Sequence, residues 1–358
     1  MQLRKLHIND YKMFKNFDMS FVDKDDNPLP IIVLAGVNGS GKTTLLEYVY
    51  DYMKYLETRR AFLGSNFIEI VARIKKPHTH KGLVPTYETP LTIHTIQKDN
   101  FTEYIDIYKQ NIIYIPAGID DIKKVESEFV KYWYNLVKFH NKRNDEITES
   151  LQTFIKETFK GLELNVTYSH IDEDDNIFFK NKKDEKFKIS ELSTGEKTLL
   201  SKVLYLFFQD YKNKVILIDE PELSLHPAWQ NRVLKLYENF ANEKENNCQI
   251  IIATHSPHII GSAKNKYIRF LIMNENDDVE VINDVMAYGR DINWVLNEMG
   301  LENTRPSKVL KKIKECKELL EEDKYDEAEK CIDDIEKNIG NNDREVLALR
   351  NSLEFWRE

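Results

Sequence analysis

Residues 36–43 read Gly-Val-Asn-Gly-Ser-Gly-Lys-Thr, and this stretch decides the fold. It follows the apolar run Ile-Ile-Val-Leu-Ala (31–35), which is typical of a strand buried on both faces, and it precedes a helical apolar pattern over 45–56. Three of the chain's 12 glycines fall here, and glycine lets backbone N–H groups curl toward phosphate oxygens at a helix N-terminus. The complete pattern in this context makes a chance glycine-rich turn the lesser alternative. We therefore predict a phosphate loop that binds ATP.

The phosphate loop also predicts individual ligands. The Lys42 ammonium would reach the β- and γ-phosphates, and the Thr43 hydroxyl would ligate Mg²⁺. The predicted nucleotide-contacting residues of this segment are Gly36, Val37, Asn38, Gly39, Ser40, Gly41, Lys42, Thr43 and Thr44.

Composition sets the class of protein. A chain of 358 residues predicts two domains or one large domain with an insertion, and 41% hydrophobic residues suffice for a buried core. Net charge is −9, so any nucleic-acid contact would come from a local patch. The three cysteines (Cys248, Cys316, Cys331) form no even framework, which indicates a reducing compartment. With no signal core and only strand-sized apolar runs, we expect a cytoplasmic protein without a membrane segment.

A second apolar strand ends in two acids. Residues 214–219 read Lys-Val-Ile-Leu-Ile-Asp, and Glu220 follows. Such a strand end alone is a common accident, but downstream of a phosphate loop it indicates a Walker B element. Asp219 would then hold the Mg²⁺ ion through its water shell, and Glu220 would act as general base on the attacking water. We interpret the nearby Glu222 as loop architecture.

The segment Leu-Ser-Thr-Gly-Glu-Lys (192–197) begins a helix about 20 residues before the Walker B element. Ser193 is a favourable N-cap and Glu196 stands three residues later, so a capping box accounts for both. A capping box gives no reason for Gly195.

The order of motifs resembles ATP-binding-cassette ATPases over about residues 1–285. The chain carries the phosphate loop, then LSTGEK (192–197), VILIDEPE (215–222), SLHP (224–227) and ATHSP (253–257). Glu196, where transporters have Gln, makes it similar to the SMC and RecF-like branch rather than to transporters. We therefore expect an α/β ABC-type P-loop core with an antiparallel β layer, a short helical insertion and a C-terminal helical extension.

The resemblance implies roles for further residues. Ser193 and Gly195, with Glu196 beside them, would contact the γ-phosphate of ATP bound to a second copy in a head-to-tail homodimer. Residues 224–226 match the D-loop that crosses the dimer seam. His255 matches the switch histidine, which contacts the γ-phosphate and orients the Glu220–water pair; a satisfied polar histidine is the alternative. Either Gln97 or Gln110 could be the Q-loop glutamine, and the residue that stacks on adenine is not assigned.

Periodicity divides the chain into three parts. Residues 1–120 and 190–290 form the ATPase head, with antiparallel strands expected at 3–8, 17–21, 67–74, 91–97 and 102–108 and a further strand at 112–116. Residues 121–189 form an insertion of two amphipathic helices and a hairpin at 177–189. Residues 291–358 carry two apolar stripes and predict a helical hairpin that must dock on the head or on a partner to bury its face.

Several features are weaker. The His78 and His80 pair lacks further ligands, so a solvated loop is favoured over a metal site, and the lysines of 180–188 predict a solvated hairpin turn. The aromatic stripe Phe129, Trp133 and Phe139 predicts core packing. No long coiled-coil arm fits between residues 43 and 192, and the roughly 100 residues after His255 are too few for a Toprim nuclease domain, so we expect no nuclease activity from this chain.

The segment YGRDINWVLNEMG (288–300) before terminal helices extends the resemblance. It is similar to compact AAA_21-type ATPases, among them the ATPase subunits of the Septu and retron-associated antiphage systems. That resemblance implies Mg²⁺-dependent ATP hydrolysis that regulates a separate effector, a nuclease. The alternatives are a RecF-like repair ATPase that clamps DNA directly and an ATP-gated scaffold with negligible turnover. A transporter subunit is the least favoured.

Overall fold

The structure is a computed structural model. It describes residues 2–57, 67–75, 86–92, 111–118, 122–159, 166–209, 211–242, 246–283, 285–300 and 305–357. The chain divides into two compact units, residues 1–295 and 296–358.

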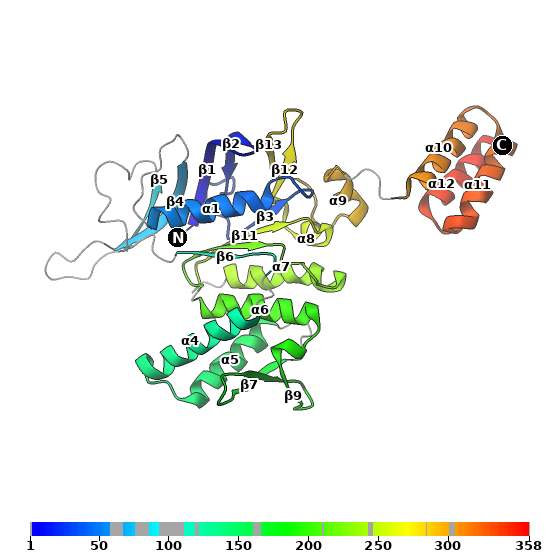
Figure 1. Cartoon of the computed structure of the whole chain (residues 1–358). Helices are drawn as coiled ribbons and strands as arrows, with labels where there is room; N and C mark the ends of the chain where they lie inside the picture. The colour runs from blue at the N-terminus through cyan, green and yellow to red at the C-terminus, as the bar shows by residue number, and fades with distance from the viewer. Residues whose placement is uncertain are drawn as a thin grey trace. The chain divides into compact units, whose positions relative to one another are not determined.

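A six-stranded sheet forms the centre of the first unit (Figure 1). Its strand order is β13-β12-β3-β11-β10-β6, and every neighbouring pair is parallel except β12 and β13. The strands are β3 (Ile31–Ala35), β6 (Ile112–Ile115), β10 (Val215–Asp219), β11 (Gln249–Thr254), β12 (Ile268–Met273) and β13 (Val279–Asn283). Every residue of β3, β10 and β11 is buried, as their continuous apolar runs predict.

Helices cover this sheet. Helix α1 (Lys42–Glu57) packs on β6, β10 and β11, whereas α7 (Pro227–Asn242) packs on β3 and β11. Figure 1 shows α1 on one side of the sheet and α7 on the other. Two short helices lie further along the chain: α8 (Pro257–Ser262) follows β11, and α9 (Ile292–Glu298) follows β13. Parallel strands require such crossovers, and the phosphate loop lies at the first of them.

A second, antiparallel sheet has the order β2-β1-β4-β5. Its strands are β1 (Gln2–Tyr11), β2 (Phe14–Ser20), β4 (Phe67–Lys75) and β5 (Thr86–Thr92). The expected antiparallel layer is therefore present. The predicted 91–97 strand overlaps the end of β5 at residues 91–92. Residues 93–97 and 102–108 lie outside the described residues.

Helix α6 (Thr194–Phe208) supports the insertion. Helix α4 (Ile122–His140) packs on α6, and α5 (Asn144–Thr158) packs on β7 (Thr167–Ile171) of a sheet completed by β8 (Ile177–Lys180) and β9 (Lys186–Lys188). Phe129 is buried against Tyr168 and Phe208, as predicted. The core prediction is wrong for Phe139, which is 67% exposed in the last turn of α4.

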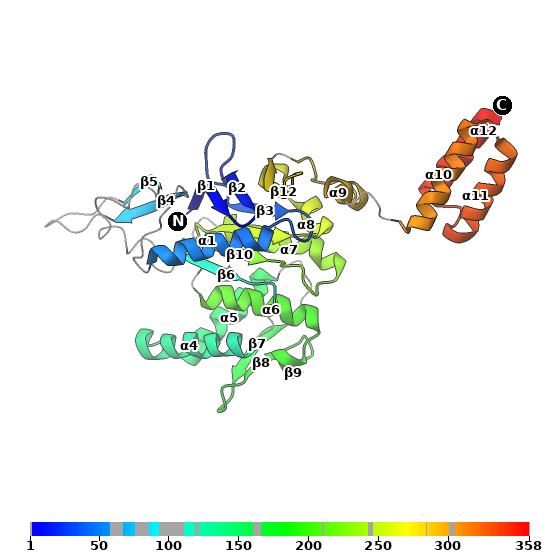
Figure 2. The same cartoon turned by 45° about the horizontal axis from the view of Figure 1, so that its top comes forward.

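The second unit is a three-helix bundle rather than the predicted hairpin. Its helices are α10 (Ser307–Glu321), α11 (Tyr325–Ile339) and α12 (Arg344–Arg357), and each packs on the other two (Figure 2). The third helix buries Val346, Leu349 and Leu353 against the stripes of the other two. Because α12 covers those stripes, the unit needs no docking surface to bury its core.

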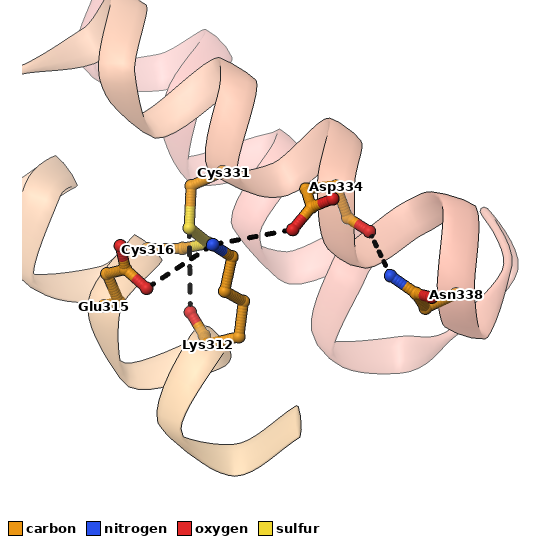
Figure 3. The surroundings of a disulfide bond; sticks show 6 residues. All are labelled: Lys312, Glu315, Cys316, Cys331, Asp334 and Asn338. Atoms are coloured by element: carbon orange, nitrogen blue, oxygen red, sulfur yellow. Dashed lines mark hydrogen bonds and ion pairs between the residues drawn. A yellow bond between two sulfur atoms is a disulfide. The ribbon is translucent and has the colours of Figure 1, made fainter. Parts of the chain in front are cut away.

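A disulfide joins α10 to α11 inside this bundle (Figure 3). It links Cys316 and Cys331, 15 residues apart, while Cys248 is free and buried. The expectation that the cysteines form no framework is therefore wrong for this pair. The spacing gave no signal because the two sulfur atoms meet only when the helices pack side by side.

Breaking this disulfide should loosen the second unit. Closing a 15-residue loop contributes about 3 kcal/mol to stability. In the full chain, Cys316→Ala/Cys331→Ala should raise amide hydrogen exchange in α10–α12 by about 100-fold, and reductant should do the same to the unmodified chain. Cys248→Ala is the control and should respond to reductant like the unmodified chain. Exchange that is the same in oxidised, reduced and double-variant protein would contradict the prediction.

Throughout the described ranges, no helix combines the length and the apolarity needed to cross a lipid bilayer.

Candidate nucleotide-binding site

The phosphate loop runs from the end of β3 to the first residue of α1. Gly39 and Gly41 adopt φ of 85° and 88°, a region that disfavours other residues. A Cβ at Gly41 would lie 2.8 Å from Met13 Sδ, so a side chain there would have to displace that methionine. A Cβ at Gly39 would meet nothing within 4 Å, which leaves that side of the loop open to a ligand. The loop therefore has the shape that close approach by phosphate requires.

Lys42 is held inside the loop. Its Nζ donates to the carbonyl oxygens of Gly36 at 2.8 Å and Val37 at 2.7 Å. Burial lowers the pKa of Lys42, and the charges of Glu220, Asp219 and Glu222 oppose that shift. The ammonium is thus aimed along the loop and faces the acidic end of β10.

Thr43 and Asp219 lie together, as the sequence predicts. The Thr43 hydroxyl donates to the Asp219 carboxylate, with distances of 3.1 Å to Oδ1 and 3.0 Å to Oδ2. Burial raises the pKa of Asp219, while the Thr43 hydrogen bond lowers it. A hydroxyl and a carboxylate at this separation are oxygen donors of the kind Mg²⁺ prefers, so the pair fits that ion.

The acids and the histidine meet at one edge of the sheet. Asp219 pairs with Ala253 and Thr254 pairs with Ala35 in the parallel register, so the loops that follow β3, β10 and β11 are adjacent. Glu220 has φ of 41°, and its amide donates to Ala253 O at 2.9 Å. Its Oε1 lies 3.0 Å from His255 Nδ1. The predicted base and switch histidine are therefore in direct contact.

Glu222 anchors the loop that carries His255. Its Oε1 accepts from Thr254 Oγ1 at 2.5 Å and from the amides of His255 and Ser256, each at 3.2 Å. The side chain is buried. Its interpretation as loop architecture agrees with these contacts, because they hold the backbone of the histidine in place.

The segment before α6 forms the expected capping box. Ser193 Oγ accepts from the Glu196 amide at 3.4 Å, and Glu196 Oε2 accepts from the Ser193 amide at 3.2 Å. The structure explains the glycine at position 195, since a Cβ there would lie 2.9 Å from Ser224 O in the predicted D-loop. Ser193 and Thr194 are exposed. The tip of α6 thus packs on the Walker B turn while its first residues face solvent.

Gly195→Ala should disturb this contact. The added methyl group would lie 2.9 Å from the Ser224 carbonyl oxygen, a backbone atom, so one of the two segments would have to shift. Overpacking of this kind costs about 1–3 kcal/mol in unfolding free energy, and we expect a lower urea midpoint and slower phosphate release. The matched control is Gly118→Ala, where a Cβ would meet nothing within 4 Å and the backbone is outside the left-handed region. A loss for Gly118→Ala as large as that for Gly195→Ala would contradict the steric explanation.

Four residues named in the sequence analysis lie outside the described residues, namely Gln97, Gln110, His78 and His80. Within the described ranges, no group of three or more His, Cys, Asp or Glu side chains is placed to hold a metal ion by itself. The 180–188 turn is solvated, as expected, with Lys180 paired to Asp184.

Sequence reasoning missed Lys202. It lies fully buried in α6, and its Nζ donates to Glu220 O. The signal was a single lysine within the apolar run Leu-Leu-Ser-Lys-Val-Leu (199–204), where an apolar side chain is the ordinary choice.

Comparison with known proteins agrees with this geometry. Residues 120–261, which include the segment from Ser193 to His255, match the AAA_21 family ("AAA domain, putative AbiEii toxin, Type IV TA system"). The chain is similar to the Septu protein PtuA of Bacillus thuringiensis, with 25% identity over 337 residues that cover 81% of this chain and 84% of that protein. It is also similar to the "Retron Vc95 probable ATPase" of Vibrio cholerae serotype O1 biovar El Tor, with 28% identity over 185 residues.

The retron match covers 48% of this chain and 34% of the retron protein, so it spans about a third of that relative. Among solved structures, an Smc head bound to the C-terminal winged-helix domain of ScpA aligns with a TM-score of 0.53 and 17% identity, covering 80% of this chain and 98% of that one. The chain therefore has the fold of an SMC-type ATPase head, matches the AAA_21 family over residues 120–261 and resembles the Septu and retron ATPases in sequence.

Proposed function

We propose that this chain hydrolyses ATP to ADP and phosphate at a site shared between two copies, and that it uses the reaction to control a separate effector in antiphage defence. The observation that carries the proposal is the convergence of Lys42, the Thr43–Asp219 pair and the Glu220–His255 pair on one sheet edge. Its ATPase part also agrees with the family match.

The geometry assigns a role to each group. Backbone N–H groups of 36–44 and the Lys42 ammonium would bind the phosphates, and Thr43 and Asp219 would hold Mg²⁺, which neutralises phosphate charge when bound. Glu220 would take a proton from water as the water oxygen attacks the γ-phosphorus. The bond from that phosphorus to the β–γ bridging oxygen breaks, and ADP leaves. His255, 3.0 Å from Glu220, would orient the carboxylate.

The second copy would contribute to the site through the tip of α6, which consists of Ser193 and the first residues of the helix. Ser193 and Thr194 are exposed there, so they are accessible to the γ-phosphate of ATP on another chain. Light scattering of Glu220→Gln should show a monomer without nucleotide and a dimer with ATP and Mg²⁺. A monomer in both conditions would contradict the shared site.

The effector is tested by native purification of Glu220→Gln with and without ATP, followed by mass spectrometry. A stoichiometric nuclease would support the regulatory role, which the similarity to the Septu protein and to the retron ATPase suggests. Purified complexes that never contain an effector protein would contradict it. The expectation that this chain has no nuclease activity is tested separately, by incubating the purified chain alone with DNA.

A DNA clamp is the second candidate, and the end of α4 favours it. Tyr134 and Phe139 are exposed there, with Lys138 Nζ 5.1 Å and 5.6 Å from their ring centres. Aromatic and cationic side chains together are typical of nucleic-acid-binding surfaces. This function predicts ATP-dependent DNA affinity that falls steeply with salt. A gated scaffold would instead show ATP binding and no phosphate release.

A further inference from the structure

A buried lysine on α6 contacts the end of β10 and the residue that follows it, Asp219 and Glu220. Lys202 is 0% exposed, midway along α6, and its Nζ donates to Glu220 O at 2.8 Å and to Asp219 O at 3.4 Å. Burying an ammonium group is costly unless oxygen atoms receive its protons. Lys202 meets those acceptors on the two residues predicted to carry Mg²⁺ binding and base catalysis.

The turn after β10 is constrained at several points. Glu220 has φ of 41°, and its carbonyl also accepts from the Leu223 amide at 3.2 Å. Ser224 has φ of 64° and its carbonyl closely approaches Gly195. Residues 219–225 therefore form a tight turn in which a shift of one carbonyl redirects the neighbouring side chain.

Helix α6 contacts this turn at two points, its first turn and its middle. Gly195, in the first turn of the helix, packs on Ser224, and Lys202, two turns later, holds Asp219 and Glu220. A helix moves as a rigid rod over this length because its backbone hydrogen bonds are continuous. A displacement of the exposed tip of α6 would therefore act on the backbone that orients the Glu220 carboxylate.

We infer that Lys202 is a positioning residue that couples the signature tip of α6 to the Glu220 carboxylate, so that contact with a second copy aligns the base for hydrolysis. This inference rests on the proposed function, because the tip of α6 is the part assigned to the other chain's ATP. Lys202 acts through the backbone of Glu220 and touches no substrate.

A purely structural lysine makes different predictions. If Lys202 only satisfied buried carbonyls, its loss would lower stability and would weaken ATP binding and turnover together. A positioning role separates these quantities, because the phosphate loop and Lys42 bind ATP on another element.

The test compares Lys202→Met with the unmodified full chain in phosphate release and in binding of a fluorescent ATP analogue. We expect kcat to fall about 10-fold while KM and analogue affinity change less than about 2-fold, since removing a remote support misplaces the base without touching the ligand site. Lys235→Met, on the exposed side of α7, is the matched control and should leave kcat unchanged.

A double variant tests the route. Gly195→Ala and Lys202→Met together should reduce kcat by less than the product of their separate effects, because both act on the same turn. If Lys202→Met does not fold, Lys202→Gln carries the same expectation, since its shorter side chain withdraws the donor from Glu220 O. The inference would be overturned if kcat were unchanged in a folded variant, or if kcat and analogue affinity fell equally. In either case the proposed function would stand as long as the wild-type chain releases phosphate. A wild-type chain that releases no phosphate would overturn both.

Discussion

Glu220→Gln should reduce phosphate release by about 10²–10⁴-fold, the usual contribution of a general base. The amide keeps the size of the side chain and its contact with His255, 3.0 Å away, but it cannot accept a proton from water. ATP binding should persist, because Lys42 and the Thr43–Asp219 pair are unaffected. Steady-state phosphate release and binding of a fluorescent ATP analogue measure the two quantities separately.

The matched control for this change is Glu173→Gln, in the exposed turn after β7. It makes the same chemical substitution far along the chain from the sheet edge and should leave turnover unchanged. Turnover by Glu220→Gln within about 3-fold of the unmodified chain would remove Glu220 from the mechanism. It would then direct attention to His255 as the base.

Lys42→Met should weaken ATP binding by about 10- to 100-fold. Charge-assisted hydrogen bonds contribute about 1.5–3 kcal/mol each, and methionine fills the same space without a donor or a charge. Phosphate release at fixed, subsaturating ATP should fall at least as far as the affinity.

Lys54→Met, near the end of the same helix, is the control for Lys42→Met. Both variants lose one positive charge from α1, so a general charge effect would appear in both. Equal weakening by the two variants would contradict a direct phosphate contact. Thermal unfolding of each variant checks that the change lies in binding and not in folding.

The local motifs and most of the head were predictable because their signals are local. The all-buried strands β3, β10 and β11 follow from continuous apolar runs, and the phosphate loop follows from glycine spacing between a strand and a helix. The capping box before α6 was likewise predictable from Ser193 and Glu196. Each of these features depends on residues within one turn or one strand.

The predictions failed where packing between distant segments determines the structure. The apolar stripe of Phe129 also suggested burial of Phe139, but Phe129 packs on Phe208 of α6 whereas Phe139 is exposed. The two stripes after residue 291 suggested a hairpin, and the third helix that completes their core was missed. The Cys316–Cys331 disulfide was missed for the same reason, since helix packing brings the two side chains together.

The sequence by itself determined the fold class, the position of the phosphate loop between a strand and a helix, and the identity of the acids and histidine at the strand ends. Tertiary structure alone decided which of these groups touch. The parallel register places Glu220 beside His255, the approach of Gly195 to Ser224 explains a glycine that capping leaves without a role, and the burial of Lys202 links α6 to Glu220. The physical reason is that motifs record local backbone and ligand requirements, whereas contacts across 17 to 35 residues, such as Lys202 with Asp219 or His255 with Glu220, exist only after the sheet and its helices have packed.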